Sequence, residues 1–211
     1  NLFPNFHQNT SRDLMFKKGK KIYFVANVEF TVINFLLSHI RTLSQYYDLT
    51  VICNTDNNAF LKKQGLNIKV IPLKISRNIH LINDVYCLIR LVLIFLKSRP
   101  DVVHSISPKS GLLAMIASFV CCVPIRIHTF TGQVWVNLKG FSKKFLKFFD
   151  ILISTLSTHN IVDSESQRKF LIKEKVLNLN KSFVFGSGSV SGVNLKKFKE
   201  NKIFFSKVRR R

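Results

Sequence analysis

Short apolar runs alternate with longer amphipathic stretches along most of the chain. The short runs are rich in β-branched or aromatic residues, as is typical of strands, and they cover 21–27, 49–53, 68–71, 101–107, 124–130, 160–163 and 182–185. The longer stretches have helical periodicity and cover 30–47, 58–64, 79–97, 111–123, 141–157 and 164–175. This alternation predicts an α/β fold with a doubly wound, mostly parallel, Rossmann-like sheet.

Polar residues cluster where two central strands are predicted to end. The sequence HSISPK occupies 104–109 and TFTGQ occupies 129–133, on either side of the predicted helix 111–123. In an open parallel sheet, ligands bind outside the carboxyl ends of the strands. The pattern therefore predicts a binding site at this edge of the sheet.

Composition and charge narrow the class of partner. The chain has 211 residues, 46% of them hydrophobic, which is enough for one substantial core. Its 33 Lys and Arg against 11 Asp and Glu give a net charge of +22, which favours a lipid surface, a phosphorylated substrate or nucleic acid. A lysine-rich surface without a specific target would have the same composition. We expect no nucleic-acid partner, because the sequence has no zinc-finger spacing, RNP-like aromatic motif or basic-region heptads.

Cysteine usage indicates a reducing compartment. Cys53, Cys87, Cys121 and Cys122 lack CxxC spacing and lie in apolar contexts, so we interpret them as buried thiols of a cytoplasmic protein. Neither a disulfide framework nor a metal site is predicted. We expect no signal peptide and no membrane span, because the most apolar stretches, 88–96 and 112–123, are shorter than about 18 residues. Both are interpreted as buried helices.

Four motifs together resemble a known family. HSISPKSGLLA at 104–114, RIHTFTGQVW at 126–135, VDSESQRKFLI at 162–172 and GSGSVSGVNLKKF at 186–198 resemble, in order and spacing, the N-terminal domain of bacterial family-4 glycosyltransferases. These are GT-B enzymes that build capsule, O-antigen and other surface polysaccharides. The resemblance implies a retaining hexosyltransferase that moves a hexose from a nucleotide-sugar to a polyprenyl-diphosphate-linked glycan, without metal or cofactor, in the cytoplasm at the inner membrane face.

The resemblance also implies a domain organisation. Residues 20–194 correspond to the N-terminal, acceptor-side domain, and 1–14 precede the first methionine as an extension outside the fold. The basic tail at 195–211 corresponds to the start of a second domain, which in the resembling enzymes holds the donor. We therefore expect the isolated chain to be inactive. The alternative is a non-catalytic basic module that binds a membrane or a partner.

Candidate site residues follow from the strand ends and the resemblance. The resemblance places Thr131, Gly132 and Gln133 beside the transferred sugar, although many relatives have His where Thr131 stands; an ordinary turn would explain the same residues. Lys109 opens a helix, where its ammonium and the helix N-terminus favour an acceptor diphosphate. The other residues expected on the acceptor side are Asn27, Glu29 and Ser107.

Two later helices carry further candidates. Ser164 and Gln167 fit a capping box, which leaves Glu165 and Arg168 to line the cleft, as the resemblance favours. The helix 141–157 is amphipathic, with an apolar stripe of Phe141, Phe145, Phe148, Leu152 and Leu156 and a basic set of Lys139, Lys143, Lys144 and Lys147. The stripe is either a core face below solvated lysines, or the lysines dock on an anionic membrane.

Overall fold

The structure of this protein is a computed structural model that describes residues 19–76, 78, 80–186 and 188–192. The extension expected at 1–14 and the basic tail expected at 195–211 lie outside the described residues.

Seven parallel strands form one sheet, in the order β3-β2-β1-β4-β5-β6-β7. The strands are β1 (Lys21–Val28), β2 (Asp48–Asn54), β3 (Lys69–Pro72), β4 (Val102–Ile106), β5 (Ile125–Phe130), β6 (His159–Val162) and β7 (Ser182–Val184). Each pair of neighbours is parallel, which confirms the doubly wound sheet predicted from the sequence. The strand order reverses between β1 and β4, where this class of sheet forms its ligand crevice.

Four longer helices agree with the predicted ranges to within a few residues. They are α4 (Leu81–Ser98), α5 (Pro108–Val120), α6 (Gly140–Leu156) and α7 (Glu165–Lys173). Short 3₁₀ turns lie at η3 (Val134–Asn137) and η4 (Leu179–Lys181). The alternation of apolar and polar positions therefore predicted the order and type of these helices correctly.

The two N-terminal helix predictions need correction. The stretch 30–47 divides into α2 (Glu29–Thr31), the π-helix η1 (Val32–Leu36) and α3 (Leu37–Leu43). The Asn34 side chain donates to the Phe30 carbonyl at 2.8 Å and so competes for an acceptor of the α-helical backbone. The stretch 58–64 keeps only the 3₁₀ turn η2 (Lys62–Gln64), which ends at Gly65 in the left-handed conformation with φ 75°.

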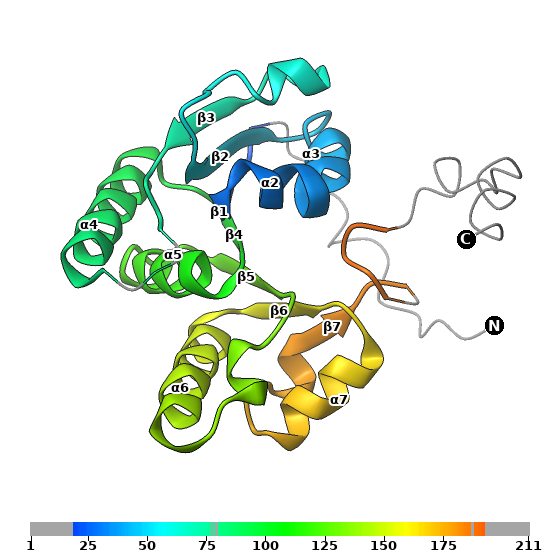
Figure 1. The fold of residues 1–211 in the computed structure, drawn as a ribbon. Helices are drawn as coiled ribbons and strands as arrows, with labels where there is room; N and C mark the ends of the chain where they lie inside the picture. The colour runs from blue at the N-terminus through cyan, green and yellow to red at the C-terminus, as the bar shows by residue number, and fades with distance from the viewer. Residues whose placement is uncertain (1–18, 77, 79, 187, 193–211) are drawn as a thin grey trace, which may run out of the picture.

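Alternate residues of the strands face two apolar cores, one on each side of the sheet. The first core joins residues of α4, α5, α6 and α7 to Val25, Val103 and Phe130. The second joins η1 and α3 to Phe24 and Ile106. Helices α4, α5 and α6 lie next to one another in the fold, with α5 in the middle (Figure 1).

Buried polar pairs connect β4 and β5 on both faces of the sheet, and the pair of Ser105 and His128 lies under helix α5. His104 Nε2 lies 2.8 Å from Thr129 Oγ1, and Ser105 Oγ lies 2.8 Å from His128 Nδ1. Burial lowers the pKa of both His104 and His128 to about 3, so both imidazoles are neutral at pH 7. His104 is thus a buried core histidine with a hydrogen-bond partner.

Helix α5 can approach His128 because position 111 is a glycine. A Cβ built on Gly111 would lie 2.7 Å from His128 Nδ1, which is closer than van der Waals contact allows. We expect Gly111→Ala to lower the free energy of unfolding by about 1 to 3 kcal/mol through overpacking. Gly132→Ala is the matched control, since nothing lies within 4 Å of its Cβ. Chemical denaturation of both variants would measure the difference, and equal stability would contradict the close approach.

The two neutral histidines predict a loss of stability in acid. An unfolded histidine binds its proton near pH 6.5, whereas His104 and His128 do so only near pH 3. The unfolded state therefore binds more protons between these values, so the free energy of unfolding falls as the pH drops from 6.5 toward 3. Each histidine contributes up to about 5 kcal/mol of this loss.

Chemical denaturation at a series of pH values would measure this slope. We expect His128→Asn to flatten it, while the exposed His159, changed to Gln, leaves it unaltered. A pH-independent free energy of unfolding in this range would contradict the lowered pKa of the two buried imidazoles, because the folded and unfolded states would then take up protons equally.

Candidate functional site

The carboxyl ends of all seven strands meet at one edge of the sheet, because every pairing is parallel. This edge brings together predicted residues from three central strands. They are Asn27 and Glu29 at the end of β1, Ser107 and Lys109 after β4, and Thr131, Gly132 and Gln133 after β5. The turn at the start of α7 follows β6 at the same edge. The polar residues therefore lie at the edge of the sheet where they were expected. The contacts of each residue indicate its role.

Ser107 joins β4 to α5 through a strained backbone. Its φ of 78° and ψ of 147° lie in a region that residues with a Cβ rarely adopt, and its hydroxyl caps no helix N–H. Asn27, on the neighbouring strand, supplies the cap instead: its Oδ1 accepts from the Ser110 N–H at 3.0 Å. The buried Asn27 thus holds the first turn of α5 in place.

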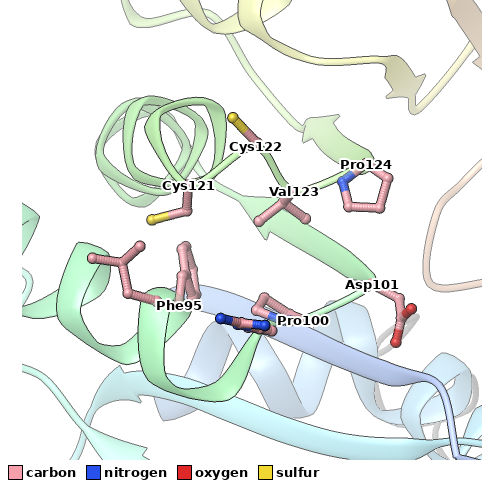
Figure 2. A pocket seen from close by; sticks show the side chains of 9 residues that line it. Phe95, Pro100, Asp101, Cys121, Cys122, Val123 and Pro124 are labelled. Carbon is pink, nitrogen blue, oxygen red and sulfur yellow. The ribbon is translucent and has the colours of Figure 1, made fainter.

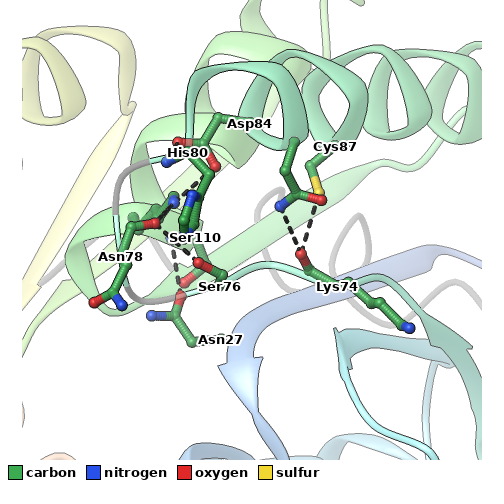
Figure 3. A network of polar contacts seen from close by, with 10 residues as sticks. Asn27, Lys74, Ser76, Asn78, His80, Asp84, Cys87 and Ser110 are labelled. Atoms are coloured by element: carbon green, nitrogen blue, oxygen red, sulfur yellow. Dashed lines mark hydrogen bonds and ion pairs between the residues drawn. The ribbon is translucent and has the colours of Figure 1, made fainter.

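Lys109 is held at the edge by an ion pair that the sequence did not reveal. Its Nζ lies 2.7 Å from Asp84 Oδ1 in the first turn of α4, and it also donates to the Asn78 carbonyl. The same carboxylate accepts from the His80 N–H at 3.2 Å (Figure 3). Both charged side chains are mostly buried. Lys109 is therefore a positioned cation with one counter-ion.

The loop after β5 presents an unused amide donor. Gln167 of α7 donates from Nε2 to the Thr131 carbonyl at 3.4 Å and to Gln133 Oε1 at 3.3 Å. The buried Gln133 Nε2 has no hydrogen-bond partner among the described residues. A buried amide N–H without a partner is costly, so Gln133 Nε2 indicates where a ligand oxygen would accept a hydrogen bond.

Trp135 anchors the same loop from below. Its Nε1 donates to Asp150 Oδ2 of α6 at 2.7 Å, and its ring stacks on Phe170 of α7. Burial raises the pKa of Asp150 to about 6, although the Trp135 N–H lowers it. Protonation of this one carboxyl stabilises the fold below pH 6 and opposes only part of the loss expected from the two histidines.

The start of α7 confirms the Ser164 cap, while the Gln167 side chain bonds to the residue before the cap, and the contacts of Arg168 differ from the expected ones. Ser164 Oγ accepts from the Gln167 N–H at 3.2 Å, and Gln167 Oε1 accepts from the Asp163 N–H at 3.0 Å. Arg168 was expected to line the cleft with Glu165. Its guanidinium instead donates to Ser182 Oγ and to the Leu179 carbonyl, and pairs with Glu165 at 3.4 Å.

The direction of Arg168 has a clear physical cause. Ser182 is the first residue of β7, so the guanidinium reaches the amino end of that strand and leaves the ligand edge. Backbone and hydroxyl acceptors there satisfy its donors. Arg168 therefore ties α7 to β7, and Glu165 is an exposed residue whose partner is Arg168.

Residues 188–190 of the glycine-rich segment are held at the same edge. Asp163 accepts from the Ser189 N–H through its carbonyl at 2.7 Å and from the Val190 N–H through Oδ1 at 2.9 Å. His39 Nε2 lies 2.6 Å from the Val190 carbonyl. A Cβ on Gly188 would lie 2.8 Å from the Asp163 carbonyl oxygen, which explains the glycine. These partners could not be predicted from local sequence patterns, because they are distant along the chain.

The basic set on α6 is only partly free. Lys143 and Lys147 place their Nζ atoms 5.9 and 5.4 Å from the Trp135 ring, and Lys147 pairs with Glu174 at 2.7 Å. Lys139 and Lys144 remain exposed. One interpretation of the α6 stripe, a core face, holds for Leu156, which packs against the core, but not for Phe141, Phe145 and Phe148, which are exposed. The buried residues of α6 are Asp150, Ile153 and Ser154.

A pocket of about 350 Å³ lies away from this edge, at the amino ends of β4 and β5. Its lining includes Pro100, Pro124, Cys121 and Cys122, and the two thiols point in different directions (Figure 2). Cys122 is exposed, which corrects the expectation of four buried thiols, because it follows the end of α5 in a turn with φ 54°. Burial raises the pKa of Cys53 to about 12, so that thiol stays protonated.

Two features are absent from the part of the chain that the structure describes, a metal-binding cluster and a membrane-spanning helix. Within those residues, no group of three or more His, Cys, Asp or Glu is arranged to hold a metal ion. No described helix has both the length and the hydropathy needed to cross a membrane.

The arrangement at the carboxyl edge suits an anionic, hydroxyl-rich ligand. Lys109 and the N-terminus of α5 supply positive charge, and Gln133 supplies a free amide donor. Glu29, which accepts a hydrogen bond from Thr55, adds a carboxylate able to accept from hydroxyls. Phosphate and sugar groups carry this combination of charge and donors.

Comparison with known proteins places this geometry among carbohydrate-active proteins. Residues 21–157 match the family described as glycosyl transferase 4-like. The chain is 31% identical over 181 residues to the capsular polysaccharide biosynthesis glycosyltransferase CapM of Staphylococcus aureus, a match that covers 86% of this chain and 47% of that protein. It is 33% identical over 125 residues to the UDP-Gal:alpha-D-GlcNAc-diphosphoundecaprenol alpha-1,3-galactosyltransferase of Escherichia coli, covering 59% and 31%.

The chain therefore spans about half, or less, of the length of these curated relatives. Among solved structures, it superposes with a TM-score of 0.63 and 20% identity on the UDP-GlcNAc 2-epimerase of Methanocaldococcus jannaschii. That match covers 89% of this chain and 54% of the epimerase, and it shows a shared fold.

The strained backbone of Ser107 predicts an unusual substitution effect. Glycine adopts the observed φ and ψ without penalty, so Ser107→Gly is expected to raise the free energy of unfolding by about 1 kcal/mol. Ser107→Ala keeps the Cβ and the strain, and is expected to leave stability unchanged. Thermal or denaturant unfolding of the two variants tests this, and a destabilised Gly variant would exclude strain at this position.

Proposed function

Because the chain belongs to the glycosyl transferase 4-like family, we propose that it forms the acceptor-binding half of a retaining hexosyltransferase that works in surface polysaccharide synthesis. The proposed reaction moves a hexose from a nucleotide-sugar to a glycan linked to a polyprenyl diphosphate. The Escherichia coli relative, whose name specifies a diphosphoundecaprenol acceptor, supports this acceptor class.

The observation that carries the proposal is the positioned cation beside the switch point of the sheet. Lys109 lies at the N-terminus of α5, so its ammonium and the helix dipole act together on an anion at the end of β4. We assign this place to the acceptor diphosphate. Binding there requires the diphosphate to compete with Asp84 for Lys109, which makes the site selective for a strongly charged ligand.

The loop after β5 lies one strand further along the edge. We propose that Thr131, Gly132 and Gln133 border the transferred sugar, with Gln133 Nε2 donating to a sugar hydroxyl. Glu29 and Ser107 would shape the acceptor side, and Asn27 acts through α5 as a positioning residue. Glu165 stays a weaker candidate, because its partner Arg168 points toward β7.

We propose that the reaction needs no metal or other cofactor. Cationic side chains and helix dipoles can stabilise the charge that develops on a leaving diphosphate. We further propose that the protein works in the cytoplasm, at the inner face of the membrane, where a lipid-linked acceptor is reached. Residues 1–211 alone supply one wall of the expected cleft, so we expect no hexose transfer by this chain by itself.

A chimera tests the proposed reaction. Residues 1–192 of this chain would replace the matching half of the Staphylococcus relative, and transfer from nucleotide-sugars to a polyprenyl-diphosphate-linked sugar would be measured. We expect Lys109→Ala to raise the acceptor KM at least about tenfold and to leave donor binding unchanged, since it removes a charge-assisted contact to the diphosphate. Lys63→Ala, on the surface turn η2, is the matched control.

Direct binding provides a second readout that needs no turnover. Farnesyl diphosphate, titrated into the 211-residue chain, should bind more weakly to the Lys109→Ala variant. A folded chimera that binds donor and transfers nothing would contradict the proposed reaction. Equal affinity of the Lys109 variant for farnesyl diphosphate would remove Lys109 from the acceptor site.

A further inference from the structure

Helix α4 is apolar over most of its circumference. One face packs on the core through Cys87, Leu91 and Phe95. The opposite face is exposed and also apolar, and it carries a stripe of Leu81, Ile82, Val85, Ile89, Leu93 and Leu96. Ile82 is 90% exposed. A large exposed apolar helix face is normally covered, so this face indicates a partner.

The neighbouring helices extend the apolar surface. Phe119 and Val120 are exposed at the end of α5, where the Cys121 thiol lies 3.6 Å from the Val92 carbonyl of α4. Phe141 and Phe148 are exposed on α6, on the other side of α5. Helices α4, α5 and α6 belong to one layer over the same core (Figure 1). The exposed apolar residues are thus spread over one layer of helices and do not form an isolated patch.

The exposed charged side chains on α4 and around the start of α6 are cations. Arg90 and Lys97 flank the α4 stripe, and Lys139 and Lys144 are exposed beside the phenylalanines of α6. The three helices contain two acids: Asp84 pairs with Lys109, and Asp150 is buried. The free charge next to the apolar stripe is therefore positive, which complements an anionic surface.

We infer that the exposed face of α4, with the outer faces of α5 and α6, is the surface by which this protein lies on an anionic lipid bilayer. The α4 stripe enters the boundary between headgroups and acyl chains, and the flanking arginine and lysines contact lipid phosphates. A second copy of this chain fits less well, because pairing two such faces would bring the flanking cations of both copies together.

The position of the stripe relates it to the acceptor site. Leu81 and Ile82 begin α4, and Asp84 in the same turn holds Lys109. A bilayer along α4 would therefore reach the carboxyl edge of the sheet, where the proposed diphosphate binds. This orientation rests on the proposed function, whereas the docking surface itself follows from exposure and charge. It also replaces the lysine face of α6 as the main contact, because Lys143 and Lys147 are engaged with Trp135 and Glu174.

The test is co-sedimentation of the 211-residue chain with phosphatidylcholine vesicles, with and without phosphatidylglycerol. We expect binding to the anionic vesicles. The variant Ile89→Gln with Leu93→Gln should bind them at least about tenfold more weakly, since two large apolar side chains no longer enter the interface. The matched control is Phe30→Gln with Leu179→Gln, which changes two exposed apolar residues outside this layer and should bind normally.

Two further measurements interpret the result. Arg90→Gln with Lys97→Gln should reduce the preference for anionic vesicles and weaken the dependence of binding on salt. Far-ultraviolet circular dichroism and unfolding curves check that each variant is folded, and Val85→Gln with Leu96→Gln is the substitute if the first pair does not fold. Both pairs replace exposed residues of the same stripe.

Equal vesicle binding by the parent and the α4 variants would overturn the inference. It would also be overturned if sedimentation velocity showed a dimer that the α4 variants dissociate while vesicle binding is unchanged. Vesicle binding needs no donor and no turnover, so these outcomes are separate from failure of the chimera in detergent, which would contradict the proposed reaction alone.

Discussion

The close approach of helix α5 to strand β5 is the constraint on which the candidate site depends. Gly111 gives His128 the space to lie directly under the helix, and His128 in turn bonds to Ser105 on the adjacent strand. The first turn of α5 is thereby held at a fixed height above the end of β4. Ser107 and Lys109 belong to that turn, so their place at the ligand edge follows from packing several residues away.

The sequence was sufficient to predict the scaffold. Periodicity and strand-bounding polar residues identified all seven strands and the four longer helices, and the motifs identified the half of a GT-B fold that the structure contains. The polar strand ends at 104–109 and 129–133 also indicated the correct edge, because parallel strands have all their carboxyl ends on one side. These features depend on local sequence and on topology.

The errors concern side chains whose direction depends on distant partners. Arg168 follows acceptors near β7, and Lys147 follows Trp135 and Glu174, none of which is close to it in the helical pattern. The stretch 88–96 of α4 was expected to be buried, and a buried face was one interpretation of the α6 stripe, since periodicity measures how apolar a face is and cannot identify what covers it. Asp84 was missed because an acid in the first turn of a helix is common for other reasons.

Trp135 is the sole tryptophan of the chain, and its surroundings make it a native optical reporter. Two lysine ammonium groups lie over the indole ring, and the indole N–H donates to the Asp150 carboxylate. The ring also stacks on Phe170 of α7, the helix whose Gln167 side chain donates to the Thr131 carbonyl and to Gln133. Its emission therefore senses the electric field and the packing at one side of the ligand edge. Events at that edge become visible in unlabelled protein, against no background from a second indole.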